Sequence, residues 1–482
     1  MRLPGKWLPS GGRGPWCSTP LPLLIALALA GGCASTATRS AASARAFGAP
    51  PGDAQESPAT GGGEGEANAT DEGGLPLHGT VSARVRARST SGTDDADLHA
   101  LANVDWGDAE RDRVTFHALG RATVDLDGRD DGGVFGDITD TYSERTNGRL
   151  YELYADVHDV APLETLRVGR QLVVDTPEVL WFDGLRAESA EHGARRARAG
   201  VYGGVPVHQF ESSPEGDFLA GAFAQARPWK GGRVRVDYTR FEDENRLGPH
   251  DNDLVGVEAW QSVSEKVGLQ GEFELLDGEE RDYRLRASYA DPEQDLTLQA
   301  SWYELLKTER DLAIDIDPYF ASLTEYFPFH QAQLAAAKGF GESYVVQAGV
   351  DARQVDDAND VSEFNRDFER YFLSFGLLDL LPAGIELTLT ADAWDGDQSE
   401  TETWGVDLST DVSERSEVAV GSYYSLYKFD YYFGQERDHV RTYYLKLRLK
   451  RTERTTFDLR YEYEDDDFED YQSLRLGALW RF

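Results

Sequence analysis

The chain ends with the stretch LRLGALWRF, residues 474–482, and this stretch decides the fold. A period of two is that of a β-strand, because successive side chains of a strand point to opposite faces. Counting back from Phe482, every second residue is apolar, namely Trp480, Ala478, Leu476 and Leu474. The sequence therefore predicts that the chain finishes in a strand with one apolar face.

The same alternation recurs from residue 77 onward, while helical periodicity is nearly absent. The clearest alternating segments are residues 81–87, 267–275, 385–393, 443–449 and 457–463. The segments are about 10–12 residues long, which matches a tilted membrane-spanning strand and exceeds the roughly 5–6 residues of a soluble strand. Alternation alone also fits a soluble β-sandwich or an extracellular β-solenoid, so the length of the segments is what favours a transmembrane barrel.

Aromatic residues gather near the ends of the expected strands, at Tyr423–Tyr424, at residues 431–433 and at Tyr443–Tyr444. Transmembrane barrels carry such residues in girdles at the two membrane interfaces. The C-terminal stretch also resembles the last strand of bacterial outer-membrane β-barrels, which ends in an aromatic residue. That resemblance implies an outer-membrane location, contact with lipids and lipopolysaccharide, and recognition of the strand ending in Phe482 by the barrel-assembly machinery. We predict an all-β, antiparallel, up-and-down transmembrane β-barrel.

The N-terminus has the features of an export signal. Arg2, Lys6 and Arg13 supply a positive region, and LPLLIALALA at residues 21–30 supplies an apolar core too short for a permanent anchor. The sequence AGGC ending in Cys33 resembles the bacterial lipoprotein box, which implies lipidation of Cys33; ordinary cleavage within residues 32–37 is the alternative. The following residues are rich in Ala, Ser, Gly, Thr and Pro and are predicted to be disordered. The expected divisions are a signal peptide at 1–33, a disordered linker at 34–74 and the barrel at 75–482.

The 482 residues include 48 Lys or Arg and 86 Asp or Glu, so the formal charge is 48 − 86 = −38. Such acidity argues against a nucleic-acid-binding protein, because binding to phosphates depends on a basic surface. The only cysteines are Cys17 and Cys33, so the barrel region has no disulfide framework, cysteine zinc site or thiol nucleophile. After residue 33 no stretch reaches the ~18 apolar residues of a membrane-spanning helix, so a membrane role depends on strands.

Two counts of the expected strands disagree by one crossing. One count runs forward from residue 77 and the other backward from Phe482, each alternating inner turns with outer loops. They agree if residues 306–342 hide an odd number of crossings, as an irregular strand with a long loop or as a constriction with a short helix over 330–338. The raw count reaches 22 as an upper bound; because over-splitting is the usual error, we expect about 18 strands, in a range of about 16–22.

If the apolar faces contact lipid, the opposite faces line the interior and carry many charges of both signs. Closure of the barrel brings the first strand close to the last ones and is predicted to form a basic stripe that an anionic solute could follow. The alternative is that these charges only pair with carboxylates and hydrate a wide interior. The candidate solute-binding residues are Arg84, Arg86, Arg88, Arg167, Arg170, Arg186, Arg233, Arg235, Lys446 and Arg448.

An internal motif points to a porin. The segments LRVGRQ at residues 166–171 and FDGLR at residues 182–186 resemble the Gly-Arg-Gln and Phe-Asp-Gly-hydrophobic-Arg segments of alginate-export-type porins. The resemblance implies a large monomeric channel with a strongly electropositive lumen, whereas this chain is acidic overall. Arg170 breaks the alternation, because it shares a face with Leu166 and Val168. Either a bulge turns its guanidinium into the pore, or it lies at the rim and reaches the lipid headgroups.

The expected function is a passive outer-membrane channel for a small polar solute or oligosaccharide, with an anionic or neutral carbohydrate as the expected class. An outer-membrane enzyme and a structural or adhesin-like barrel are the alternatives. The nine His residues form no recognisable catalytic group, and motifs of serine hydrolases, metalloproteases and heme attachment are absent, so we expect no enzyme and no cofactor. The acidic loops show no ordered spacing of calcium ligands, so no metal site is expected.

Overall fold

The computed structural model describes residues 76–482 except 91, 129–134, 136–144, 175, 177–178, 208–216, 246–247, 308–327, 357–366, 379–380, 397–398, 431–434 and 467–469. These residues belong to the second of two compact units, Glu64–Phe482. The predicted signal peptide at 1–33, the linker at 34–74 and the lipidation of Cys33 lie outside the described residues and stay predictions.

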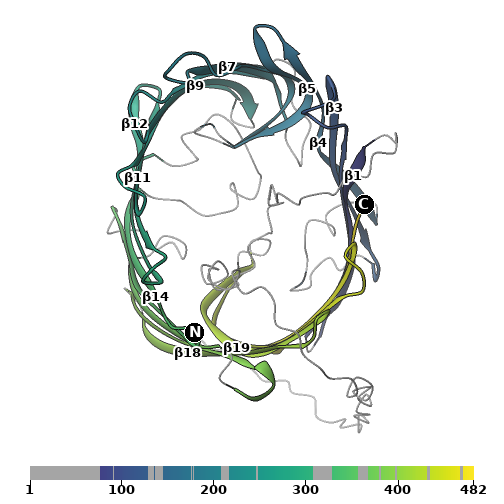
Figure 1. Ribbon diagram of the computed structural model, residues 1–482. Helices are drawn as coiled ribbons and strands as arrows, with labels where there is room; N and C mark the ends of the chain where they lie inside the picture. Colours follow the sequence, from purple (N-terminus) through teal and green to yellow (C-terminus); the bar gives the residue numbers. More distant parts are fainter. Residues whose placement is uncertain are drawn as a thin grey trace, which may run out of the picture. The chain divides into compact units, whose positions relative to one another are not determined.

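The described chain forms one antiparallel barrel of 22 strands (Figure 1). Each strand pairs with the next one in the sequence, and β1 also pairs with β22. The predicted all-β antiparallel barrel is thereby confirmed. The strands are β1 (Leu77–Ser89), β2 (Asp94–Trp106), β3 (Val114–Asp125), β4 (Thr146–Val160), β5 (Leu163–Val173), β6 (Leu180–Ser189), β7 (Arg198–Pro206), β8 (Phe218–Ala226), β9 (Gly232–Asn245), β10 (Gly248–Ser262), β11 (Val267–Leu276), β12 (Glu279–Asp291), β13 (Leu296–Leu305), β14 (Phe329–Phe340), β15 (Tyr344–Val355), β16 (Phe368–Leu377), β17 (Glu386–Gly396), β18 (Ser399–Ser413), β19 (Ser416–Asp430), β20 (Gln435–Lys450), β21 (Thr455–Asp465) and β22 (Asp470–Arg481).

The pairing of β1 with β22 closes the sheet and removes its edges. Gly79 and Phe482 exchange two backbone hydrogen bonds at this seam, with N···O distances of 3.0 and 3.1 Å. A closed sheet satisfies its backbone polar groups internally, which is the requirement for strands that cross a bilayer. No helix in the described ranges is both long enough and apolar enough to cross a membrane.

The observed number of strands equals the upper bound of 22, so the expectation of about 18 is wrong. Several connections contain only two residues, including 161–162, 277–278 and 414–415. Such tight turns use little of the chain, and more strands fit into the same length than average loops would allow.

The crossing hidden in residues 306–342 is β14, a strand paired with both of its neighbours. It supplies the single crossing that makes the forward and backward counts agree. The alternative of a strand with a long connection is therefore confirmed, and the alternative of a constriction with a short helix over residues 330–338 is wrong, because pairing with β13 and β15 overrides the helix propensity of the alanines. Among the described residues, the one helical element is the short 3₁₀ helix η3 (Pro382–Gly384), which connects β16 to β17.

The longest connections meet at one end of the barrel, which we call the long-loop end. They span residues 126–145, 207–217, 306–328 and 356–367. The opposite, short-turn end carries the beginning of β1 and the end of β22. Outer-membrane barrels keep short turns on the periplasmic side and longer loops outside, so the observed distribution matches the predicted topology.

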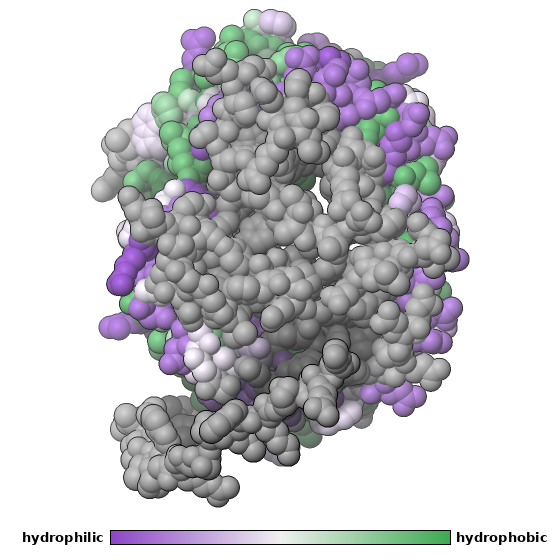
Figure 2. Space-filling view, turned by 180° about the vertical axis from the view of Figure 1, so that it is seen from behind, coloured by the Kyte–Doolittle hydropathy of each residue, from purple (hydrophilic) through white to green (hydrophobic). Residues whose placement is uncertain are grey.

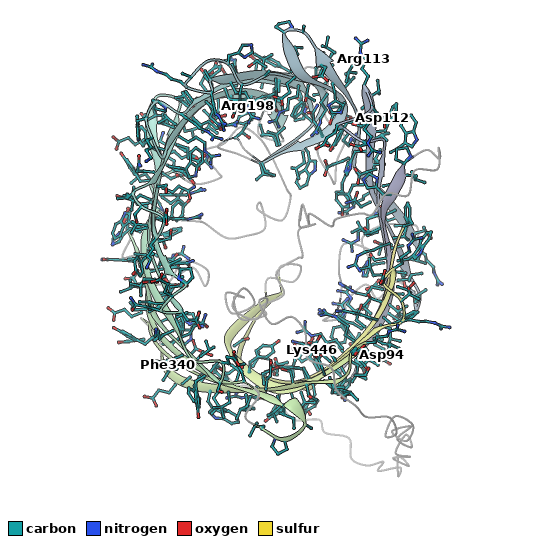
Figure 3. All side chains as sticks on the ribbon, in the orientation of Figure 1. Asp94, Asp112, Arg113, Arg198, Phe340 and Lys446 are labelled. Atoms are coloured by element: carbon teal, nitrogen blue, oxygen red, sulfur yellow. The ribbon has the colours of Figure 1, made fainter. Side chains whose placement is uncertain are left out.

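The inner and outer faces of the wall follow from two labelled side chains. Figure 3 shows Lys446 on β20 and Arg198 on β7 at the inner side of the wall. Directly paired residues of antiparallel strands lie on the same face, so the strand register extends this assignment around the barrel. Figure 2 shows hydrophobic residues on the outer flank of the barrel. Exposed apolar residues at outward positions include Val168, Val201, Leu285, Leu334, Leu389, Leu447 and Leu476.

The largest buried apolar cluster faces inward, toward the lumen. Its members lie on β5 to β11, mostly in the halves of these strands near the long-loop end. The lumen face is therefore only partly charged, which the sequence analysis did not anticipate. The cluster consists of Val173, Leu180, Phe182, Tyr202, Leu219, Phe241, Leu254 and Leu276.

Candidate functional site

The closing seam places four cationic side chains in one row on the inner wall. Lys446 on β20 pairs with Arg460 on β21, which pairs with Arg475 on β22. Arg475 pairs in turn with Arg86 on β1. Neighbouring strands are about 4.7–4.9 Å apart, so these four residues form a compact group, the seam row. Closure thus joins the two halves of the predicted basic stripe through Arg460 and Arg475.

The other basic residues predicted for this part of the wall flank the seam row. Arg84 and Arg88 lie on the same face of β1 as Arg86, two residues away on either side. Arg448 lies two residues beyond Lys446 on the same face of β20. All of these candidates are therefore inward and lie next to the seam row.

In each ion pair of the seam, the cation is more exposed than its carboxylate partner. Arg86 lies 2.6 Å from Asp97, and the two side chains are 21% and 2% exposed. Arg448 lies 3.5 Å from Glu417, with exposures of 53% and 37%. A solute in the lumen therefore meets guanidinium groups before carboxylates. Among the described residues, five pairs have this arrangement, namely Arg86–Asp97, Arg88–Asp95, Arg88–Asp97, Arg448–Glu417 and Arg460–Glu462.

An aromatic ring supports the first cation of the seam row. The Nζ atom of Lys446 lies 4.3 Å from the centroid of the Tyr444 ring. The Tyr444 hydroxyl donates a hydrogen bond to Asp407, and the ring crosses Gly421 on β19, where a Cβ atom would overlap it. Tyr444 is thereby fixed on both sides, and it holds Lys446 through a cation–π contact.

A second group of inward cations surrounds Phe223 on β8, whose side chain is 4% exposed. The guanidinium carbons of Arg235, Arg198 and Arg186 lie 4.0, 5.6 and 5.9 Å from the centroid of its ring. Glu188 neutralises two of them, at 2.6 Å from Arg186 and 3.4 Å from Arg198. These cations are held between a ring and carboxylates.

The other candidates on this part of the wall also contact carboxylates or aromatic rings. Arg235 and Asp237 form an ion pair of 2.8 Å in which both side chains are buried. Arg167 makes two hydrogen bonds of 2.8 and 2.9 Å to Asp156 and lies 3.7 Å from the Tyr154 ring centroid. Arg233 lies 3.4 Å from the Trp260 ring centroid. Arg167, Arg186, Arg233 and Arg235 are thus inward, but they lie on β5 to β9 and not at the seam.

The structure does not bring Arg170 into the lumen. Arg170 pairs with Asp183 on β6, and Asp183 pairs with Val205, which shares the outward face of β7. The Nε and Nη2 atoms of Arg170 donate hydrogen bonds of 2.8 and 2.7 Å to the Asp183 carboxylate. The bulge that would turn Arg170 inward is absent at this position, because its register with β6 is regular.

Arg475 and Arg198 are among the inward cations that the candidate list missed, together with Arg460, Arg353 and Arg370. Arg475 lies on the polar face of the C-terminal stretch, and its alternation with Leu474 and Leu476 is the signal that could have revealed it. Arg198 begins β7 after several other arginines, and the pattern there gives no signal for its direction.

A closed barrel of 22 antiparallel strands with an apolar outer surface is the architecture of bacterial outer-membrane proteins. The barrel lies in the outer membrane. Within the described part of the chain, no group of three or more His, Cys, Asp or Glu side chains is placed to hold a metal ion.

No protein-family model and no curated protein matches the chain. Among solved structures, it is similar to OccK3 (OpdO) of Pseudomonas aeruginosa, with 12% identity, a TM-score of 0.42, and coverage of 84% of this chain and 96% of that chain. OccAB2 of Acinetobacter baumannii shows 8% identity, a TM-score of 0.43 and coverage of 84% and 98%. The siderophore receptor PirA of Pseudomonas aeruginosa shows 11% identity, a TM-score of 0.48 and coverage of 86% and 81%. We draw no functional conclusion from similarities at this level.

Proposed function

We propose that the chain is a passive outer-membrane channel for small polar solutes and that it favours anions. The observation that carries this proposal is the exposure of the cations in the seam ion pairs, where the carboxylates lie deeper in the wall. The chain is acidic overall, but selectivity depends on the charges that line the path of the solute and not on the net charge.

The seam row is suited to transient binding. Lys446, Arg460, Arg475 and Arg86 form a row of neighbouring cationic positions on adjacent strands. A unit charge 4 Å away contributes about 1 kcal/mol in water and about 4 kcal/mol at an effective dielectric constant of 20. Binding in this range attracts an anion and still releases it, which conduction requires.

We further propose that the solute is an anionic or neutral carbohydrate, as in alginate-export-type porins. The resemblance rests on residues 166–171 and 182–186, which lie on the paired strands β5 and β6. Two arginines of the motif, Arg167 and Arg186, are direct cross-strand partners on the inner wall. Both arginines are already paired with carboxylates, Arg167 with Asp156 and Arg186 with Glu188, so an acidic sugar would meet the more exposed cations of the seam.

Swelling of liposomes that contain the purified barrel tests this function. Neutral sugars of increasing size should enter up to a cut-off, and monocarboxylated sugars of equal size should enter faster than the neutral ones. Entry of neutral sugars without any advantage for the acidic ones would contradict the anion preference. Complete impermeability in correctly folded samples would leave a structural or adhesin-like barrel as the function.

A further inference from the structure

Exposed cations gather at the short-turn end of the seam. Arg451 and Arg454 lie in the connection between β20 and β21. The backbone N–H of Lys450 donates a 2.7 Å hydrogen bond to the carbonyl of Arg415, and that of Arg481 donates one of 2.7 Å to the carbonyl of Arg454. These bonds hold neighbouring chain segments together, and all five side chains are exposed. We call this group the short-turn basic patch; it comprises Arg415, Lys450, Arg451, Arg454 and Arg481.

The short-turn basic patch has little negative charge of its own. Within the described part of the chain, none of its five side chains forms an ion pair. The same connections contain two carboxylates, Glu414 and Glu453, so the local formal charge is 5 − 2 = +3. The patch therefore presents positive charge to the solvent, although the whole chain carries −38.

The chain enters the barrel beside this patch. Thr80 on β1 pairs with Arg481 on β22, and β1 begins three residues earlier, at Leu77. Residues that precede Leu77 therefore reach the barrel at the short-turn end, next to the seam.

The sequence just before β1 is acidic. Residues 64–72 lie outside the described residues; their sequence, EGEANATDE, contains four carboxylates and no Lys or Arg. Glu72 is five residues from Leu77 and Glu64 is thirteen, so an extended chain spans at most about 17 and 43 Å from that point. Neighbouring strands are about 4.7–4.9 Å apart, and the connection between β21 and β20 begins two strands from β1, so the patch is within reach.

The other side of β1 offers this segment no comparable attraction. The connection at residues 107–113 is also close to the start of β1, because Gly107 donates a backbone hydrogen bond of 3.1 Å to the carbonyl of Pro76. It contains three carboxylates and two arginines, and Arg111 lies 3.5 Å from Asp108. The acidic segment thus enters the barrel between a basic surface and an acidic one.

We propose that residues 64–72 of this chain bind the short-turn basic patch. One exposed ion pair contributes little, but several neighbouring charges of opposite sign act together. Lys450 and Arg481 take inward positions, because they share strand faces with Lys446 and Arg475. A bound segment therefore lies at the mouth of the lumen below the seam row, where its carboxylates lower the positive potential that an anion meets. This inference does not depend on the identity of the solute.

Cross-linking within the chain in native outer membranes tests the contact. Asn68→Cys, in the acidic segment, is combined with Glu453→Cys in the 451–454 connection of the patch. The matched control combines Asn68→Cys with Glu110→Cys, which also replaces an exposed Glu and lies in the 107–113 connection, one strand nearer to β1. A bismaleimide should link the first pair roughly fivefold more than the control, with single-cysteine variants as background. Equal linking of the two pairs, or more in the control, would overturn the proposal.

Neutralising the patch tests whether charge holds the segment. With the cysteines at 68 and 453, Arg451→Gln/Arg454→Gln should remove most of the preference, whereas Arg111→Gln/Arg113→Gln should leave it intact. Raising the salt from about 0.1 to about 1 M shortens the Debye length from about 10 to about 3 Å and should also remove it. Cross-linking that neither the patch variant nor salt reduces would contradict the proposed contact.

A carbodiimide applied to the parent chain tests the contact without any substitution, in case a variant does not fold, as judged by heat-modifiable migration. Mass spectrometry should find an amide between Lys450 and Asp71 or Glu72. Lys230, an exposed lysine in the connection between β8 and β9 at the same end, is the control and should form none. Absence of the Lys450 product, or an equal amount with Lys230, would oppose the proposal.

Discussion

The alternation of apolar and polar residues places different side chains on the inner and outer faces in two parts of the barrel wall. At the seam, formed by β20, β21, β22 and β1, inward positions carry cations and outward positions such as Leu447 and Leu476 are apolar and exposed. On the wall from β5 to β11, inward residues such as Phe182 and Leu254 are apolar and fully buried, and the outward face carries the Arg170–Asp183 pair. Alternation of apolar and polar residues therefore predicts the usual surroundings of a strand, which are lipid outside and water inside. The prediction is wrong where a face contacts other side chains instead.

The ion pairs of the two parts also differ in how exposed the cation is relative to its carboxylate partner. At the seam the carboxylate lies below a more exposed cation, so the pair still offers positive charge to the lumen. Around Phe223, Arg235 and Asp237 are both buried, and the pair contributes to the packing of the wall. The seam is therefore the part of the wall assigned to solute, and the Phe223 group is assigned to stability.

Removing a cation should change the free energy of unfolding far more around Phe223, where the cation is buried, than at the seam. Arg235→Gln leaves Asp237 as a buried charge without its partner, which should lower the free energy of unfolding by about 3–5 kcal/mol. Arg448→Gln at the seam, where both partners are exposed, should lower it by less than about 1 kcal/mol. Urea unfolding in lipid vesicles measures both values, and equal losses would contradict the division of roles.

A charge placed on the lipid-facing side of the seam should have the next largest effect on the free energy of unfolding. Leu476, in the middle of β22, is outward and 44% exposed, so Leu476→Arg puts a guanidinium in the lipid and should cost about 2–4 kcal/mol. The neighbouring inward change Arg475→Leu is the matched control and should cost far less. Vesicle unfolding again provides the measurement, and a harmless Leu476→Arg would mean that this face does not contact lipid.

Substitution of two glycines by alanine should give a smaller difference in the free energy of unfolding. At Gly184 on β6, an added Cβ would lie 2.1 Å from the backbone oxygen of Gly203, so Gly184→Ala should destabilise the barrel by about 1–3 kcal/mol. At Gly477 on β22, the nearest atom is 2.2 Å away but belongs to the carboxylate of Asp458, which can rotate aside. Gly477→Ala should therefore cost less than Gly184→Ala, and the reverse order in unfolding experiments would argue against the observed pairing of β6 with β7.

The sequence was sufficient for the barrel, the order of its turns and the inward direction of most candidate arginines. The parity argument located β14, because an up-and-down barrel with both ends on one side needs an even number of strands. For the alanine-rich residues 330–338 the sequence left a strand and a short helix open, since helix propensity is local and strand pairing is not. The direction of Arg170 was left open, because its position follows from the register with Asp183, a partner that no local pattern specifies.

The most direct test of the account is the reversal potential of single channels in a planar bilayer under a salt gradient. The native channel should favour chloride over potassium, and the double variant Lys446→Gln/Arg448→Gln should reduce the permeability ratio severalfold. Arg111→Gln, which removes an exposed cation from the short connection at residues 107–113, should leave the ratio unchanged. A cation-selective native channel whose ratio the double variant does not alter would contradict the central claim.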